Sequence, residues 1–283
     1  MTKQVLAVTL RAMTPDDLDR ALELSRDFQW PHRDEDWAFF LEIGEGLVAE
    51  HDGQIVGTIM AWRFGDKVAT IGMVIADRAV QGQGIGRKLM EAMIAQLDGY
   101  SVVLNATKEG LPLYEKLGFV EIGCIHQHQG LAPVVPLPEL QPDERVRPLG
   151  QADQGVADFY SRATGMDRTK LVAALIERDK GVVLTRGHEP VGFAMLRRFG
   201  RGWSIAPVVA PDAGGAKALI LHWLAQNTGT FSRLDVSDES GLSPWLTELG
   251  LPHVGGGIKM VRGTVPVEDA AFHAFGLTAQ ALT

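Results

Sequence analysis

Two segments in opposite halves of the 283-residue chain repeat each other. Residues 46–65 and 181–200 align without a gap and are identical at Gly46/Gly181, Val48/Val183, Val56/Val191, Gly57/Gly192, Met60/Met195, Arg63/Arg198, Phe64/Phe199 and Gly65/Gly200. Shorter matches follow in the same order, between 71–76 and 205–210, 104–107 and 234–237, and 117–118 and 249–250. Because order and spacing are kept, the sequence predicts a duplicated domain; chance similarity between two α/β domains is the alternative.

The stretch between the repeats is rich in proline. Residues 131–148 (LAPVVPLPELQPDERVRP) hold five of the chain's 14 prolines. Proline lacks an amide donor and fixes φ, so the stretch predicts a semi-rigid linker and not a helix or a central strand; a long loop inside one domain is the alternative. We therefore expect four parts, namely a first domain over 1–130, the linker over 131–148, a second domain over 149–263 and a C-terminal tail over 264–283.

The negative charge is confined to the first half. The net charge of −8 argues against a nucleic-acid partner, since a phosphate backbone requires an excess of Lys and Arg. Residues 1–140 contain 12 basic and 20 acidic residues, whereas residues 141–283 contain 15 of each. Twelve of the acidic residues lie between Asp16 and Asp52. A solvated helix face and a surface that attracts a cationic ligand both fit this cluster.

Cysteine content and hydropathy indicate in which cellular compartment the protein is expected. Cys124 is the only cysteine, which excludes an internal disulfide and favours a reducing compartment. Its apolar surroundings (FVEIGCI) indicate packing, with a nucleophile as the alternative. The N-terminus lacks the apolar core of a signal peptide, and no apolar run approaches the ~18 residues that span a bilayer. We expect a cytoplasmic protein without a membrane partner, and an apolar fraction of 46% suits two packed cores.

Helical and strand patterns alternate along the first half. Thr14-Pro15 provides a helix start, and Asp52-Gly53 provides a hairpin turn. The patterns predict a strand over 8–13, a helix from Leu18 to Leu24, a helix over 37–43, strands over 47–50, 55–64 and 67–76, a helix over 87–97, a strand over 101–104, a helix over 111–117 and a strand over 119–128. The expected fold class is therefore mixed α/β (α+β).

A glycine-rich turn links an apolar strand to a helix, in the segment Gln81-Gly82-Gln83-Gly84-Ile85-Gly86-Arg87-Lys88-Leu89. Such a turn lets successive backbone N–H groups converge beside the positive end of a helix dipole, which favours a phosphate or pyrophosphate. The P-loop motif does not fit, because Gly86 is followed by Arg87, and Lys88 by Leu89. The dinucleotide fingerprint requires a different glycine spacing.

This Q-x-x-G-x-G loop resembles the coenzyme A loop of the GNAT superfamily of acetyl-CoA-dependent N-acetyltransferases. The later segment LYEKLGF, residues 113–119, resembles the second signature of the same superfamily. The resemblance covers residues 8–130 strongly and 145–262 weakly. It implies two tandem GNAT-like domains, each a mixed, mostly antiparallel twisted sheet flanked by helices.

The resemblance also implies a co-substrate, acetyl-CoA. Backbone groups of Val74, Ile75 and Ala76 would bind the pantetheine arm. Backbone amides of the loop would bind the pyrophosphate, at Gln81, Gly82, Gln83, Gly84, Ile85, Gly86 and Arg87. Asn105, at the end of the flanking strand, would bond the pantetheine amides or act only as a strand-ending turn residue.

The sequence offers one candidate for the acid of the reaction and several for the base. Tyr114 matches the tyrosine that protonates the departing thiolate in many family members, and a phenol suits this role; packing in the core is the alternative. Thr70 stands where some relatives carry a carboxylate base. A water chain, another acidic residue, or one of His126 and His128, which share a strand face, remain as candidates. A metal site is not favoured, because no third ligand has suitable spacing.

The second half lacks several of these parts. Its loop, from Pro211 to Leu219, is about four residues shorter, and the counterparts of Gln81 and Gly82 are missing. Leu246 stands opposite Tyr114. The sequence therefore predicts a degenerate copy that supports the first domain or walls its acceptor site.

The acceptor side is predicted at the early helix pair. Candidate substrate residues there are Trp30, His32, Asp34 and Trp37, although burial in the helix pair is the alternative for both tryptophans. The expected function is transfer of an acetyl group from acetyl-CoA directly to a primary amine of a small molecule or peptide, and a cationic acceptor is one interpretation of the acidic cluster. The alternative is a non-catalytic acyl-CoA-binding or regulatory protein. The expected assembly is a monomer or a homodimer.

Overall fold

The two halves repeat one order of helices and strands. The computed structural model describes residues 6–150, 153 and 155–283; residues 1–5, 151, 152 and 154, which the expected domain ranges include, lie outside the described residues. The first half contains β1 (Thr9–Ala12), α1 (Leu18–Asp27), α2 (Asp34–Ile43), β2 (Glu45–His51), β3 (Gln54–Phe64), β4 (Val68–Ala76), α3 (Ile85–Gln96), β5 (Ser101–Ala106), α4 (Leu111–Lys116) and β6 (Val120–Leu131).

The second half contains β7 (Glu144–Pro148), α5 (Val156–Thr164), α6 (Thr169–Arg178), β8 (Lys180–Arg186), β9 (Glu189–Phe199), β10 (Gly202–Ala210), α7 (Ala213–Gln226), β11 (Phe231–Ser237), α8 (Leu242–Glu248) and β12 (His253–Arg262), and it adds β13 (His273–Gly276). Short 3-10 helices precede α1, α3 and α8, at Pro15–Asp17, Arg78–Val80 and Asp238–Ser240. The predicted mixed α/β fold and the predicted duplication are confirmed.

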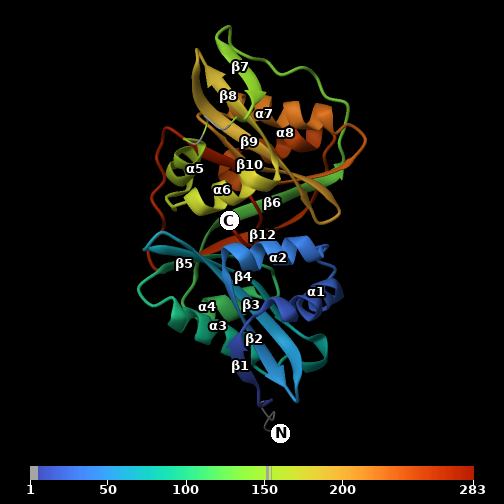
Figure 1. The fold of residues 1–283 in the computed structure, drawn as a ribbon, viewed down its shortest axis with the longest axis vertical. Coiled ribbons are helices and arrows are strands. Elements are labelled where there is room, and N and C mark those ends of the chain that lie inside the picture. Colours follow the sequence, from blue (N-terminus) through green and yellow to red (C-terminus); the bar gives the residue numbers. More distant parts are fainter. Residues whose placement is uncertain (1–5, 151–152, 154) are drawn as a thin grey trace.

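Strands of both halves form one sheet. Its order is β1-β2-β3-β4-β5-β12-β6-β11-β10-β9-β8-β7, with β13 added on β10. The pairs β4–β5 and β10–β11 are parallel, and the other pairs are antiparallel. The last strand of each half is exchanged, because β12 lies between β5 and β6, and β6 lies between β12 and β11 (Figure 1). The expected boundary at residue 130 therefore divides the chain but not the sheet.

The expected linker and tail both contain ordered elements. Residues 132–143 form neither helix nor strand, but β7 lies inside the expected linker and pairs with β8 as the last strand of the sheet. Its last residue is Pro148, and an edge strand tolerates a proline because one side needs no amide donors. The expected tail contains β13, and Leu277, Ala279 and Leu282 of the tail are buried.

Helices cover both faces of the sheet. On one face, α3 and α4 pack on the first half, and α7 and α8 pack on the second, each over its own apolar core. A third core joins the helix pairs α1–α2 and α5–α6 of the two halves. These pairs meet in the middle of the molecule, beside β6 and β12 (Figure 1). No helix among the described residues has the length and apolar character to cross a membrane.

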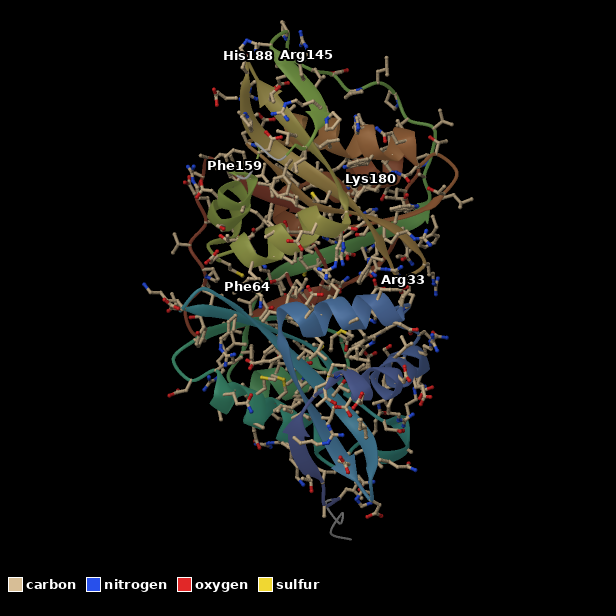
Figure 2. All side chains as sticks on the ribbon, viewed as in Figure 1. Arg33, Phe64, Arg145, Phe159, Lys180 and His188 are labelled. Carbon is tan, nitrogen blue, oxygen red and sulfur yellow. The ribbon has the colours of Figure 1, made fainter. Side chains whose placement is uncertain are left out.

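Two contacts join the halves, and in each a side chain of one half packs against a ring of the other. In the first, the ring of Phe199, in the β9–β10 hairpin, packs edge-on against His32 in the α1–α2 loop, with 5.6 Å between centroids. In the second, the guanidinium of Arg168, before α6, lies 4.2 Å from the ring centre of Phe64 at the end of β3. Figure 2 shows Arg33 and Phe64 at this junction. Each half therefore builds part of the surroundings of the other's helix pair.

Candidate active site

β4 and β5 separate after a short stretch of pairing. They pair only from Val68 to Thr70 on β4, so the edge of β4 beyond Thr70 has no strand partner on that side among the described residues. Met73 has a φ of 53°, and the register between β3 and β4 shifts in the same region. Such a bulge turns the strand and redirects its main-chain groups. The predicted pantetheine residues, Val74–Ala76, lie on this free edge directly after the bulge.

The glycine loop leaves the first turn of α3 open. Gly82 and Gly84 have φ angles of 75° and 81°, in the left-handed region that favours glycine. Gly84 is the N-cap of α3 and supplies no side-chain acceptor. The first N–H that bonds back to the loop belongs to Lys88, at 3.0 Å from Gly84 O. The N–H groups of residues 85–87 consequently have no acceptor among the described residues, which suits a bound anion.

Two basic residues, Arg87 and Lys88, follow the glycine loop, and they differ in how firmly their side chains are held. Lys88 Nζ donates a hydrogen bond of 3.0 Å to Leu6 O, which ties it to the N-terminal segment. The Arg87 side chain is 57% exposed and pairs with Glu91 one helical turn later, at 2.8 Å. An exposed pair of this type is weak, so Arg87 can turn to a phosphate.

Tyr114 lies on α4, beside the start of α3. A Cβ built at Gly86 would lie 3.7 Å from Leu113, which places the two helices in contact there. The Tyr114 ring packs on Phe119, with 6.0 Å between centroids, and it is nearly buried. This burial raises the pKa of the Tyr114 phenol to about 12. The phenol therefore stays protonated at neutral pH and can act as a hydrogen-bond donor.

A pocket of about 280 Å³ lies at the start of the separation between β4 and β5. The first half contributes Gln29, Trp30, Pro31, His32, Phe40, Ile71, Gly72, Met73, Asn105, Thr107, Gln127 and Gln129, and the second contributes Phe199, Arg201, Arg233, Gly256, Ala279, Gln280 and Ala281. We call it the acceptor pocket. It brings together two of the predicted acceptor residues, Trp30 and His32.

His32 faces the acceptor pocket as a neutral ring. It packs edge-on against Trp37, Phe40 and Phe199. Its Nδ1 atom is buried without a hydrogen-bond partner. Burial lowers the pKa of His32 to about 4, with the charge of Arg233 adding to the effect and that of Asp36 opposing it. The ring is therefore uncharged near neutral pH and is a weak base.

Two predicted acceptor residues do not line this pocket. Trp37 is fully buried in the core, and its Nε1 donates to Ser25 Oγ at 3.3 Å. The structure corrects the substrate role proposed for it, because apolar packing against α1 removes it from the surface. Asp34 is exposed at the first turn of α2 and is absent from the lining of the acceptor pocket.

Asn105 serves a segment that sequence reasoning missed. Its Nδ2 donates to Gln280 O at 2.8 Å, while its Oδ1 is buried without a hydrogen-bond partner, so the oxygen is left to accept a pantetheine N–H and that role stays a prediction. A Cβ at Gly72 would lie 2.7 Å from Ala281 Cβ, so glycine leaves the room for the C-terminal segment to approach β4. Residues 279–281 thereby form one wall of the acceptor pocket. The apolar character of AFGLTAQAL was the available signal that this segment is buried.

The other proposed bases lie away from the acceptor pocket. His126 bonds Asp238 at 3.0 Å. His128 is fully buried, with Nδ1 2.9 Å from Leu251 O and Nε2 2.9 Å from Ser243 Oγ. Neither lines the acceptor pocket, and both ring nitrogens of His128 are already hydrogen-bonded, which disfavours His128 as a base. Thr70 is buried and has no carboxylate to offer. Among the described residues, no three His, Cys, Asp or Glu form a group suited to a metal ion.

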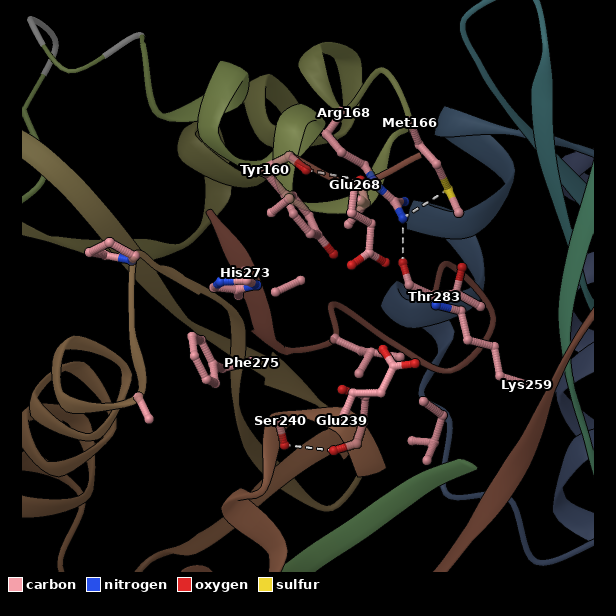
Figure 3. Close-up of a pocket in the computed structure, with 18 of the residues that line it drawn as sticks. Tyr160, Met166, Arg168, Glu239, Ser240, Lys259, Glu268, His273, Phe275 and Thr283 are labelled. Carbon is pink, nitrogen blue, oxygen red and sulfur yellow. Dashed lines mark hydrogen bonds between the residues drawn. The ribbon is translucent and has the colours of Figure 1, made fainter. Parts of the chain in front are cut away.

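The equivalent slot in the second half is filled by the chain itself. β13 pairs antiparallel with Val208, Val209 and Ala210 of β10, the counterparts of Val74–Ala76. Leu277 N–H then donates to Asp235 O of β11 at 2.9 Å. β13 therefore occupies the gap where β10 and β11 separate. A cavity of about 350 Å³ remains beside it, with Tyr160, Arg168, His273 and Phe275 in its wall (Figure 3).

A carboxylate caps the N-terminus of α7, the helix that follows this slot. Asp212 is the N-cap of α7, and its Oδ1 accepts the N–H of Gly215 at 2.8 Å. That bond, with the Arg186 ion pair at 3.2 Å, lowers the pKa of Asp212. Sequence reasoning noted the shorter loop but missed this cap, which an Asp just before a helical pattern indicates. At the Tyr114 position, Leu246 is fully buried.

Comparison with known proteins identifies both halves. Residues 42–121 and residues 156–276 each match an acetyltransferase (GNAT) domain family. The chain is 29% identical over 241 residues to the uncharacterized N-acetyltransferase YitH of Bacillus subtilis, covering 81% of this chain and 82% of YitH.

Solved structures share the whole fold. A proposed acetyltransferase from Pyrococcus horikoshii superposes with a TM-score of 0.80 at 20% identity, over 100% of this chain and 99% of that one. A GCN5-related N-acetyltransferase from Sphaerobacter thermophilus gives a TM-score of 0.69 at 13% identity, over 94% and 99%. These structures show the shared fold, and the two domain matches with the likeness to YitH establish that the chain belongs to the GNAT acetyltransferases and carries two GNAT domains in tandem.

Proposed function

We propose that the first half transfers an acetyl group from acetyl-CoA directly to a primary amine held in the acceptor pocket. One observation carries this proposal: the free edge of β4 leads from the acceptor pocket toward the uncapped first turn of α3. A coenzyme A molecule needs both features, because its pantetheine amides pair with an open strand edge and its pyrophosphate accepts N–H groups at a helix start. The residues present therefore fit acetyl-CoA.

Each chain group has a defined task in this reaction. The N–H groups of residues 85–87 and the guanidinium of Arg87 bind the pyrophosphate. The edge at Val74–Ala76 aligns the pantetheine arm, so that both substrates are held together and no covalent enzyme intermediate is required. Tyr114 donates a hydrogen bond to the sulfur as negative charge develops on it, which stabilises the transition state.

The second half, in this proposal, binds no coenzyme and does not catalyse. β13 takes the main-chain groups of β10 that would pair with pantetheine, and Asp212 takes the helix N-terminus that would bind a phosphate. Its contribution is structural: Phe199, Arg201 and Arg233 complete the acceptor pocket of the first half. The cavity of about 280 Å³ suits a small molecule or the end of a peptide.

Calorimetric titration with acetyl-CoA, followed by a thiol-release assay over a panel of primary amines, tests the proposal. We expect one acetyl-CoA bound per chain and turnover with at least one amine. Binding without turnover for every amine would favour a non-catalytic acyl-CoA-binding protein instead. Two molecules bound per chain would contradict the role given to β13.

A further inference from the structure

The charged groups of the acceptor pocket all have one sign. Its lining contains two arginines, Arg201 and Arg233, and no aspartate or glutamate. The remaining polar residues in the wall are neutral amides and a threonine, together with His32, whose ring is uncharged near neutral pH. Both arginines come from the second half of the chain, on the β9–β10 hairpin turn and on β11.

The two arginines differ in how far their charge is compensated. Arg233 donates through Nε and one terminal nitrogen to Asp235 Oδ2, at 2.9 and 2.7 Å, and Asp235 is buried behind it. This pair is close to neutral as a unit and holds the guanidinium in a fixed orientation. Arg201 is exposed and has no ion-pair or hydrogen-bond partner for its guanidinium among the described residues. The pocket therefore has about one net positive charge.

The acidic cluster predicted to attract a cation is directed elsewhere. Asp36 is buried, where it accepts hydrogen bonds from Arg33 and from the N–H of Gly200 at 2.9 Å. Glu35 and Glu42 line a separate surface hollow beside Arg178 and Arg197. No member of the cluster between residues 16 and 52 lines the acceptor pocket. The acidic cluster therefore adds no carboxylate to the pocket wall, although the charge of Asp36 still acts on His32 from behind it.

The lining of the acceptor pocket also bears on the missing base. An ammonium group must lose a proton before it attacks, and a nearby positive charge lowers its pKa. The pocket offers no carboxylate for this step, and the neutral His32 ring is a weak base. Because an anionic group on the acceptor itself would offset the charge of Arg201 on binding, the positive charge of the pocket does not replace the missing base.

We propose that the acceptor amine carries an anionic group, a carboxylate or a phosphate, and that Arg201 with Arg233 binds it. This inference rests on the proposed acetyl transfer and names the acceptor class for the same pocket. Arg233 supplies a pre-oriented guanidinium, and Arg201 supplies the uncompensated charge. A planar guanidinium matches both anions through paired hydrogen bonds. Arg201 and Arg233 are thus specificity-determining residues supplied by the half that keeps no coenzyme site.

Charge-matched acceptor pairs provide the test. The panel comprises 4-aminobutyrate against 4-aminobutanamide, amino acids against their amides, phosphoethanolamine against ethanolamine, and spermidine as a cation. We expect kcat/KM for the anionic member to exceed that of its neutral partner by about tenfold or more, the size of one charge-assisted hydrogen-bond pair. The carboxylate and phosphate arms separate the two kinds of anion.

Three variants assign the preference to its residue. Arg201→Gln should lower kcat/KM for the anionic acceptor about tenfold more than for its neutral partner, with the affinity for acetyl-CoA unchanged. Arg201→Lys should restore part of the loss, because it restores the charge. Arg198→Gln is the matched control, since Arg198 packs over Trp203 and does not line the acceptor pocket.

Several outcomes would overturn the inference. These are a neutral or cationic acceptor used as well as the anionic ones, a preference that survives Arg201→Gln, or no acetylation of any anionic member by a protein that binds acetyl-CoA. Failure to bind acetyl-CoA at all is a different result, because it overturns the proposed function itself.

Discussion

The two halves of the chain share a scaffold but treat its two coenzyme-binding features in opposite ways. In the first half, the edge of β4 at Val74–Ala76 is free and α3 begins at Gly84 without a cap. In the second half, β13 pairs with Val208–Ala210, and the carboxylate of Asp212 caps α7. The difference teaches that the order of helices and strands can be kept while a shorter loop, an added strand and a capping carboxylate occupy the equivalent positions.

In the second half, β13 and Asp212 make the contacts that the proposed function assigns to a coenzyme in the first half. An extended strand offers the same main-chain partners to β10 that a pantetheine arm would offer to β4. The carboxylate of Asp212 accepts a helix N–H and carries negative charge, as a phosphate would. The second half therefore keeps its main-chain groups satisfied without a coenzyme, while the first half leaves donors at residues 85–87 that a ligand can satisfy.

The largest expected effect comes from Tyr114, the position where the second half has Leu246. Tyr114→Phe removes the phenol proton while keeping the ring that packs on Phe119. We expect kcat to fall 100- to 1,000-fold, which is about 3–4 kcal/mol, with the affinity for acetyl-CoA unchanged. Steady-state kinetics and calorimetry measure the two quantities.

The matched control for this change is Tyr100→Phe. Tyr100 lies before β5 with Arg63 near its ring, at 5.6 Å from the centroid; neither tyrosine lines the acceptor pocket, but only Tyr114 lies on α4 beside the start of α3. Its kcat should stay within a factor of two of the unmodified protein. Equal activity of Tyr114→Phe and Tyr100→Phe would remove Tyr114 from the mechanism and leave it as a core residue.

A smaller effect is expected from giving the first half the acidic cap of the second. Gly84→Asp places a carboxylate at the start of α3, and Gly84→Asn places an uncharged group of the same shape there. Asp and Asn both tolerate the φ of 81° at this position better than most residues. We expect the Asp variant to bind acetyl-CoA about tenfold more weakly than the Asn variant, because only the Asp repels the pyrophosphate.

Comparing the two variants removes the backbone strain that both share. Their dissociation constants, measured by calorimetry, should converge as salt is raised, since screening weakens a charge effect near the surface. Equal affinities at low salt would show that the pyrophosphate does not approach Gly84.

Local elements of this fold were predictable from the sequence. The loop from Gln81 to Arg87 and the repeat of 46–65 in 181–200 depend on residues close together in the chain, so turn chemistry and periodicity located them. The same holds for the pair Trp30 and His32, which lie in one short loop and reach one pocket together.

Long-range pairing could not be predicted in the same way. β12 and β6 carry patterns of ordinary strands, and nothing in either pattern states which half of the sheet each joins. The surroundings of Trp37 and Asn105 depend on the folded chain. Trp37 is buried in an apolar core, and Asn105 donates a hydrogen bond to the carbonyl of Gln280, which lies far along the chain. The presence of Arg201 and Arg233 in the acceptor pocket could not be predicted for the same reason, because both come from the other half.

The smallest expected effect comes from opening one of the two closures in the second half. Asp212→Ala removes the cap of α7, and we expect a loss of about 1 kcal/mol in the free energy of unfolding, measured by chemical denaturation. Asp212→Asn is the matched control, since its amide oxygen still caps the helix and should keep most of that stability. Neither variant should change kcat, because the acceptor pocket and the α3 loop are untouched.

The informative readout of these two variants is the number of acetyl-CoA molecules bound per chain. It should stay at one, because β13 still pairs with Val208–Ala210 after the carboxylate is gone. Two molecules bound to Asp212→Ala would show that the carboxylate alone closed the second site and that an incoming coenzyme displaces β13. One molecule bound to both variants would instead assign the closure to the strand, whose hydrogen bonds with β10 a pantetheine arm would have to replace one for one.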